Sequence, residues 1–287
     1  MGIIFPFAIK VVAVVSVITI FLGFAEVNNA LHPPRIIPPG NTLRKYEINY
    51  ESIDLITTDG IRLSAWYTPP RKRGVVILLA HGYGDNRPEW IHALLAKKGY
   101  GVLAWDARAH GESDGEISTM GYLEVLDVRA ALDYVLAQPG VEHVGAWGGS
   151  MGGATLIRAA ADFPEIEALF IDSSFASLDD EFNYLVPYPV INPLAKLIAT
   201  TKTGINLEAV DPLKDIAKIS PRPVYIVHGT GDTVAPPDAG RKLYEAASDP
   251  RFLWEAESIQ HMMIYLDNPR RYQRRLLGFF DEWLLGK

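Results

Sequence analysis

The chain has 287 residues, of which 48% are hydrophobic and 21% charged, so it is long enough for one large globular domain or two small ones. Its net charge of −7 gives no reason to expect a nucleic-acid partner. The absence of cysteine excludes disulfides and thiolate metal sites.

The first 26 residues are expected to lie outside the globular domain. Residues 3–25 are apolar apart from Lys10. They fit either a cleavable signal peptide or a retained membrane-spanning helix, with Lys10 reaching the near headgroups. We favour the retained anchor. This predicts a protein of the cell membrane with a single N-terminal anchor. Basic residues flank the segment on both sides, so its orientation stays open, although an extracytoplasmic domain is favoured.

Residues 27–45 are rich in proline and predict an extended tether between this segment and a domain spanning residues 46–287. That domain opens with two alternating stretches, residues 52–57 and 61–67, on either side of an Asp-Gly turn. This pattern is typical of a β-hairpin.

A βαβ rhythm follows the hairpin. Residues 75–80 are continuously apolar, as expected for a strand buried on both faces of a parallel sheet. Later segments alternate between strands and helices of 10 to 15 residues, which indicates an α/β protein with a doubly wound, mostly parallel sheet. The expected helices are 88–98, 122–136, 154–161, 238–247 and 269–285, and the expected strands are 101–105, 143–149, 166–172, 224–227 and 252–255.

The rhythm is interrupted between residues 174 and 220. This stretch is rich in aromatic residues and proline, and it predicts a small cap of short helices inserted over one edge of the sheet. We find no dinucleotide-binding G-x-G-x-x-G motif and no P-loop motif in the sequence.

Polar residues follow several of the expected strands, where functional loops of a doubly wound sheet collect. Gly148, Ser150 and Gly152 have the G-x-S-x-G spacing of a nucleophile elbow, in which a side chain at either glycine would collide with a neighbouring strand or helix. The other groups are His81-Gly82-Tyr83-Gly84, the run from Asp106 to Ser113, His228-Gly229 with Asp232, and His261.

With these motifs in this order, residues 46–287 resemble the α/β-hydrolase superfamily, and most of all its membrane-anchored, small-cap (ABHD-like) serine hydrolases. The resemblance implies that Ser150 is the nucleophile, His261 the general base and Asp232 the acid that orients it. The alternatives are a turn serine, a surface-loop histidine, and Asp172 or Asp179 as the acid.

The resemblance also implies an oxyanion hole formed by the backbone N–H groups of Tyr83 and Met151. Several side chains of the expected cap could line an acyl pocket or simply pack the cap onto the sheet: Phe175, Phe182, Tyr184, Leu185 and Tyr188.

The expected function is therefore hydrolysis of carboxylic esters of apolar acyl groups, as in an esterase or monoacylglycerol lipase, without a metal or cofactor. A thioesterase or serine peptidase on the same triad is the main alternative, and a non-catalytic, membrane-tethered binding protein is a weaker one. The acidic residues Asp106, Glu112, Asp114 and Glu116 are interpreted as a solvated loop rather than a calcium site.

Overall fold

A computed structural model describes residues 21–25, 27–39, 42–71 and 74–286. Their strands form one eight-stranded sheet in the order β1-β2-β4-β3-β5-β6-β7-β8, in which β3 to β8 are parallel and β2 is antiparallel to both its neighbours. The expected mostly parallel sheet is confirmed. The strands are β1 (Glu51–Ile56), β2 (Arg62–Thr68), β3 (Val75–Ala80), β4 (Gly101–Trp105), β5 (His143–Gly149), β6 (Ile166–Asp172), β7 (Val224–Gly229) and β8 (Arg251–Ala256).

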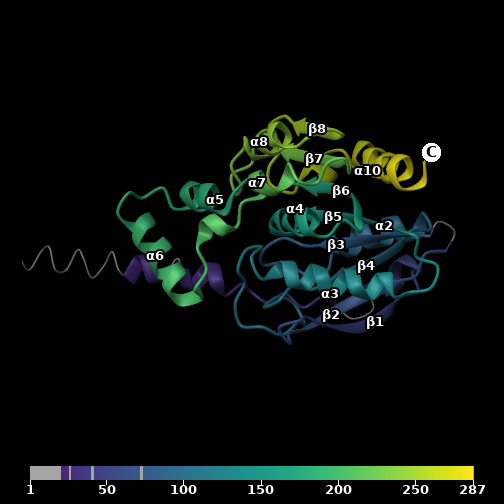
Figure 1. The fold of residues 1–287 in the computed structure, drawn as a ribbon, viewed down its shortest axis with the longest axis horizontal. Helices are drawn as coiled ribbons and strands as arrows, with labels where there is room; N and C mark the ends of the chain where they lie inside the picture. Colours follow the sequence, from purple (N-terminus) through teal and green to yellow (C-terminus); the bar gives the residue numbers. More distant parts are fainter. Residues whose placement is uncertain (1–20, 26, 40–41, 72–73, 287) are drawn as a thin grey trace, which may run out of the picture.

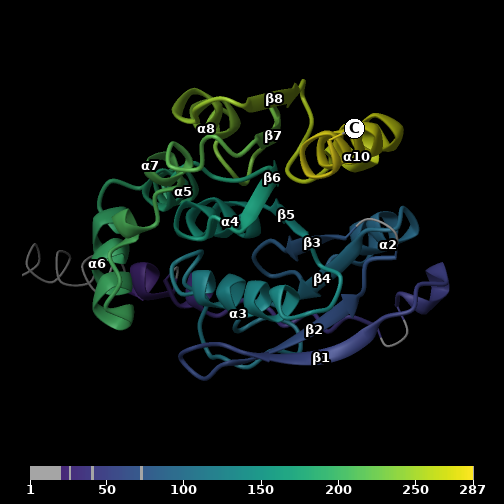
Figure 2. The same ribbon diagram turned by 45° about the vertical axis from the view of Figure 1, so that its right-hand side comes forward.

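Helices cover both faces of the sheet, as Figures 1 and 2 show. One buried cluster joins the sheet to α3 (Glu124–Leu136), α4 (Met151–Asp162) and α8 (Ala239–Ala246). A second cluster on the other face joins it to α2 (Glu89–Lys97) and α10 (Pro269–Leu285). Every residue of β3 is buried, which explains its continuously apolar sequence. A 3-10 turn, η1 (Arg44–Tyr46), precedes β1, and the short helix α9 (Ile264–Asp267) precedes α10.

The chain order reverses between β3 and β5, which lie side by side. After β3 the chain adds β4 on one side of this pair, next to β2, whereas β6, β7 and β8 follow β5 on the other side. Such a switch point leaves a crevice outside the carboxyl ends of the two strands, where doubly wound proteins bind ligands. The loops that begin at His81 and Ser150 leave the sheet at this place.

The segment between β6 and β7 contains α5 (Leu178–Leu185), α6 (Ile191–Thr203), η2 (Leu207–Ala209) and α7 (Pro212–Ile216). Its helix ends have local causes. The Ser177 hydroxyl accepts a hydrogen bond from the Asp180 amide at the start of α5, and Gly204 takes the left-handed conformation that ends α6. Together these elements form the cap.

The expected extended tether differs from the structure at its beginning. Residues 27–31 are helical, and Val27 and Leu31 are buried in one cluster with Ala195 and Ala199 of α6. Both ribbon views place this purple helix beside α6. Burial against α6 stabilises a helical turn that the sequence alone does not favour, so this part of the chain is a wall of the cap. The described residues between Pro33 and η1, 33–39 and 42–43, contain no helix.

The expected membrane-spanning helix lies largely outside the described residues, which begin at Phe21. Within the described ranges, no helix combines the length and apolar character required to cross a membrane.

Candidate active site

Ser150 occupies the sharp turn between β5 and α4. Its backbone has φ of 50° and ψ of −120°, a strained conformation for a residue with a side chain. The flanking glycines are required sterically. A Cβ at Gly148 would lie 2.6 Å from the Gly152 carbonyl oxygen, and one at Gly152 would lie 2.3 Å from that of Ala80. The turn therefore has the geometry of a nucleophile elbow.

Asp232 and His261 meet at the carboxyl ends of β7 and β8. The Nδ1 atom of His261 lies 2.7 Å from Oδ2 of Asp232, whose side chain is fully buried. The other oxygen, Oδ1, accepts hydrogen bonds from the amides of Val234 and Ala235 at 2.8 and 2.9 Å. This carboxylate accepts only, so Nδ1 carries the proton and the His261 Nε2 is left as the basic nitrogen.

The loop of His261 also contacts the elbow. A Cβ at Gly149 would lie 2.6 Å from the Met262 methyl carbon, and the Met262 amide donates to the Ser173 hydroxyl at 3.2 Å. No hydrogen bond joins Ser150 to His261 within the described structure. The structure thus pairs Asp232 with His261 and sets the loop of His261 against the elbow of Ser150.

The loop after β3 faces the serine. A Cβ at Gly82 would lie 3.2 Å from Cβ of Ser150. His81 fixes this loop, because its Nε2 accepts from the Ala107 amide at 2.9 Å and its Nδ1 donates to the Gly82 carbonyl at 2.7 Å. The Met151 amide lies in the first turn of α4, where helical N–H groups have no partner within the helix. The Tyr83 amide thus belongs to the loop after β3, next to Gly82, and the Met151 amide belongs to the first turn of α4, directly after Ser150.

The acidic run that begins at Asp106 is solvated only in part: Glu112, Asp114 and Glu116 are exposed, as expected, whereas Asp106 is not. Asp106 is fully buried, and its carboxylate accepts hydrogen bonds from the amides of Arg87 and Glu112 at 2.9 and 2.8 Å. The buried Arg87 guanidinium lies 3.2 Å from Asp106 through Nε, and it also donates to Glu112 and to Ser64. These contacts tie the loop after β3 to the loop after β4.

The substitution Arg87→Met is expected to lower the free energy of unfolding by about 3–5 kcal/mol, because it leaves the Asp106 carboxylate buried without its cation. Burial already raises the pKa of Asp106, and Arg87 opposes that rise. In the variant, the Asp106 carboxyl keeps its proton to higher pH in the native state than in the unfolded chain. The free energy of unfolding therefore falls as pH rises. Urea unfolding should therefore show that the variant loses more free energy of unfolding, relative to the wild-type protein, at about pH 7 than at about pH 4.

Arg129→Met is the matched control, because Arg129 pairs with the exposed carboxylates of Asp133 and Glu165 at the surface. Its expected cost is below about 1 kcal/mol. Equal, small costs for the two variants would contradict the assigned role of Arg87.

Asp172 lies in a buried hydroxyl network beneath the elbow and does not bond loop amides. It accepts hydrogen bonds from Tyr272 at 2.7 Å and Ser173 at 2.9 Å. The Trp147 indole in turn donates to the Tyr272 hydroxyl at 2.9 Å. Burial raises the pKa of Asp172 to about 6. This network connects Tyr272 of α10 to Trp147 of β5 and Asp172 of β6. Trp147 lies three residues before Ser150 in the chain.

A pocket lies between the cap and the N-terminal helix, with about 620 Å³ of empty space that includes space open to solvent. Of the expected pocket residues, only Phe182 and Leu185 line it. Phe175 is instead buried against α4 with Ala154 and Leu178. Tyr184 donates to the Asp232 carbonyl at 3.3 Å, and Tyr188 is exposed on the cap. The other lining residues are Val27, Ala30, Leu31, Ser118, Thr119, Met120, Leu178, Glu181, Ala199, Thr203, Ile205 and Leu207. We call this space the cap pocket.

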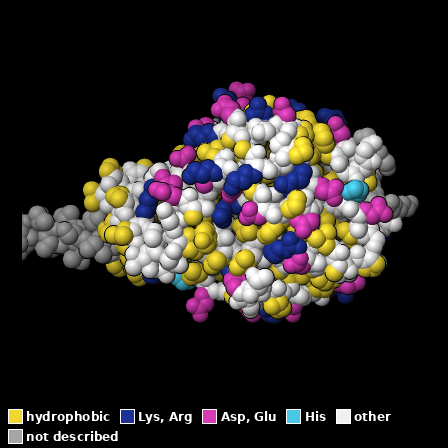
Figure 3. Space-filling model, in the orientation of Figure 1, with side chains coloured by type: hydrophobic (Ala, Val, Ile, Leu, Met, Phe, Trp, Pro, Cys, Tyr) yellow, Lys and Arg dark blue, Asp and Glu magenta, His cyan; other side chains and the backbone are white. Residues whose placement is uncertain are grey.

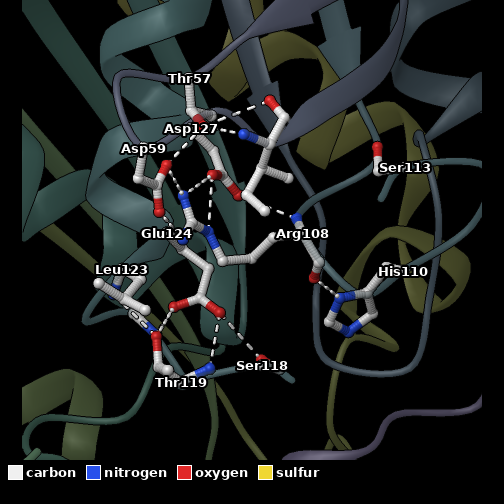
Figure 4. Close-up of polar contacts among 12 residues, drawn as sticks. Thr57, Asp59, Arg108, His110, Ser113, Ser118, Thr119, Leu123, Glu124 and Asp127 are labelled. Atoms are coloured by element: carbon white, nitrogen blue, oxygen red, sulfur yellow. Dashed lines mark hydrogen bonds and ion pairs between the residues drawn. The ribbon is translucent and has the colours of Figure 1, made fainter. Parts of the chain in front are cut away.

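One wall of the cap pocket is held by buried polar contacts, drawn in Figure 4. Glu124 accepts hydrogen bonds from the amide and hydroxyl of Thr119 and from the hydroxyl of Ser118. In the same network Arg108 bridges Asp127, at 2.7 Å, and Asp59, at 2.8 Å. Burial raises the pKa of Asp127 to about 7. These contacts fix the 118–120 loop, so that wall of the pocket is preformed.

Glu181 is a pocket residue that the sequence analysis missed. It is only 4% exposed, and burial together with the negative charge of Asp232 raises its pKa to about 8. Helical spacing contains the signal that could have found it, because residues 178, 181, 182 and 185 share one face of α5.

Residues 75–191 match the family model described as the α/β hydrolase fold. This chain has the α/β-hydrolase fold. Among solved structures, it is similar to the Pyrococcus furiosus esterase Pf2001, with 24% identity and a TM-score of 0.75 over 89% of this chain and 99% of that one. The membrane-anchored, small-cap subgroup stays a prediction.

The similarity to curated relatives extends over most of the chain. The uncharacterized protein YqkD of Bacillus subtilis is 28% identical, over 77% of this chain and 76% of its own. The α/β hydrolase domain-containing protein WAV2 of Arabidopsis thaliana is also 28% identical, over 84% and 82%. The similarity thus covers the sheet and the cap together.

Proposed function

We propose that this α/β hydrolase is a serine hydrolase that cleaves carboxylic esters of apolar acyl groups, with Ser150, Asp232 and His261 as its catalytic triad. The observation that carries the proposal is the hydrogen bond of 2.7 Å between Asp232 and His261. The loop of His261 also packs against the strained elbow of Ser150. A buried acid, an oriented imidazole and an elbow serine are the parts that nucleophilic acyl transfer requires.

In the proposed reaction the Ser150 Oγ attacks the acyl carbonyl while His261 Nε2 takes its proton. Asp232 holds the imidazole in the required tautomer and stabilises its charged form. His261 then protonates the departing alcohol, which leaves an acyl group on Ser150. A water molecule, deprotonated by His261, releases the acid and restores the serine. The backbone N–H groups of Tyr83 and Met151 would stabilise each tetrahedral oxyanion.

The cap pocket supports an apolar acyl group as the bound part of the substrate. Its lining consists mainly of apolar side chains from α5, α6, the N-terminal helix and the 118–120 loop. An apolar lining of this kind favours a hydrocarbon chain over the polar backbone of a peptide, because unpaired peptide groups are costly to bury. We therefore place ester hydrolysis ahead of peptidase activity.

Labelling with a fluorophosphonate probe tests the proposal. The purified protein is expected to become covalently modified at Ser150, as mapped by mass spectrometry of the digested product, because such probes react with activated serines. The Ser150→Ala variant should remain unlabelled. Absence of labelling in the wild-type protein, or equal labelling of both proteins, would contradict the assignment.

We also propose that residues 3–25 anchor the protein in the cell membrane with the domain on the extracytoplasmic side. Support comes from the run of residues 11–25 without charge, and from Phe21 and Phe24, which are exposed where the described chain begins. Figure 3 shows further hydrophobic side chains on the cap end of the surface. The protein should stay in the membrane fraction after a high-salt wash, whereas release would indicate peripheral binding or a cleaved signal.

A further inference from the structure

The cap pocket contains a carboxyl group without a partner. Glu181 extends from α5 into the pocket lining and is 4% exposed. Its Oε2 atom is buried and has no hydrogen bond to any described residue. A buried oxygen in this state costs free energy, so its retention in an otherwise apolar pocket requires a reason.

The other polar side chains of the lining already have partners. The hydroxyls of Ser118 and Thr119 donate to Glu124, as Figure 4 shows, and the Thr203 hydroxyl donates to the Ala199 carbonyl at 2.8 Å. Among the described lining residues, Glu181 is therefore the polar side chain available to a ligand. Because its pKa is raised to about 8, Glu181 is mostly protonated near neutral pH and can both donate and accept.

The pocket adjoins the proposed catalytic residues on two sides. Ser118 contacts the sulfur of Met151, the residue after the nucleophile, at 3.5 Å. One turn after Glu181 on the same helix, Tyr184 donates to the Asp232 carbonyl. The 118–120 loop and α5, which both line the pocket, thus also contact the first turn of α4 and the loop of Asp232.

We infer that the cap pocket selects acyl chains that carry a hydroxyl group, and that Glu181 is the specificity residue that hydrogen-bonds this hydroxyl. The inference rests on the proposed esterase function and names its substrate class. A hydroxyl donates one hydrogen bond and accepts others, which matches a protonated carboxyl group. The rest of the chain would contact the apolar walls.

A hydroxyl fits this pocket better than an ammonium group. An ammonium ion has three donors and would have to leave water for a space with one free carboxyl group, since Ser118, Thr119 and Thr203 are already bonded. Removing an ion from water costs several kcal/mol, which a single partner repays poorly. A neutral hydroxyl carries a far smaller cost.

The test compares p-nitrophenyl esters of plain acyl chains with esters of ω-hydroxyacyl chains of the same length, over about 4 to 12 carbons. For the preferred length, wild-type kcat/KM should favour the hydroxylated ester by about tenfold, the value of one hydrogen bond to an otherwise unpaired buried group. Glu181→Leu should lose or reverse this preference. Glu181→Gln should keep part of it, because an amide also donates and accepts.

The preference is the ratio of kcat/KM for the hydroxylated ester to kcat/KM for the plain ester, measured within each variant. A general loss of folded protein or of activity affects both values and cancels. Equal ratios in the wild-type protein and Glu181→Leu would overturn the inference, and so would a preference for ω-aminoacyl esters. If the folded wild-type protein hydrolyses none of the esters and resists the fluorophosphonate probe, the proposed function itself fails. Hydrolysis with no preference for the hydroxyl defeats the specificity assignment alone.

Discussion

Replacement of Ser150 by alanine is expected to lower kcat for ester hydrolysis by about 10⁶-fold, the loss seen when a comparable triad loses its nucleophile. Alanine has no oxygen to form the acyl-enzyme, so only transition-state stabilisation by the oxyanion donors and substrate binding remain. The measurement is the initial rate with a short p-nitrophenyl ester. A high enzyme concentration makes a loss of this size measurable.

The variant should keep its fold, because the Ser150 side chain makes no hydrogen bond with the described residues and alanine adds no atoms to the turn. Its thermal unfolding should therefore match that of the wild-type protein to within a few degrees. A folded variant that retains more than about 1% of the activity would show that another group is the nucleophile.

Asp232→Asn is expected to lower kcat by about 10⁴-fold, as in triads whose acid becomes an amide. The asparagine oxygen would accept from the amides of Val234 and Ala235, as Oδ1 of Asp232 does, and its NH₂ group would face His261. The imidazole would then accept at Nδ1 and carry its proton on Nε2, so it could no longer take the proton of Ser150.

Asp238→Asn is a matched control, since Asp238 is an exposed aspartate on the same loop, at the start of α8, where it pairs with Lys242. Its activity should stay within about twofold of the wild-type value. Fluorophosphonate labelling should slow in Asp232→Asn but not in the control. A loss of less than about tenfold in Asp232→Asn would assign the role of the acid to another residue.

The sequence was sufficient to predict the sheet, because its signals are local and strong. An apolar run such as β3 fits only a strand covered on both faces, and glycines at 148 and 152 fit only a turn with backbone on either side. The hydrogen bond between Asp232 and His261 joins loops whose positions follow once the strand order is known.

Other features depend on contacts between distant parts of the chain and were missed for that reason. Asp106 looked solvated because its cation, Arg87, comes from the preceding loop. Glu181 is an acidic residue, a type that is usually exposed, so the sequence did not indicate its burial. Its side chain becomes buried when α5 packs beside the N-terminal helix. That helix was itself interpreted as a tether because prolines at 33 and 34 dominate the local pattern.

The packing of the N-terminal helix against α6 links the evolution of two distant segments. Val27 and Leu31 share one buried cluster with Ala195 and Ala199. A change of side-chain volume on one side of this contact alters the packing on the other side. Among homologues of this protein, residue volumes at positions 27 and 31 should therefore covary with those at 195 and 199, whereas positions 36 and 37, which are exposed, should vary independently of the cap.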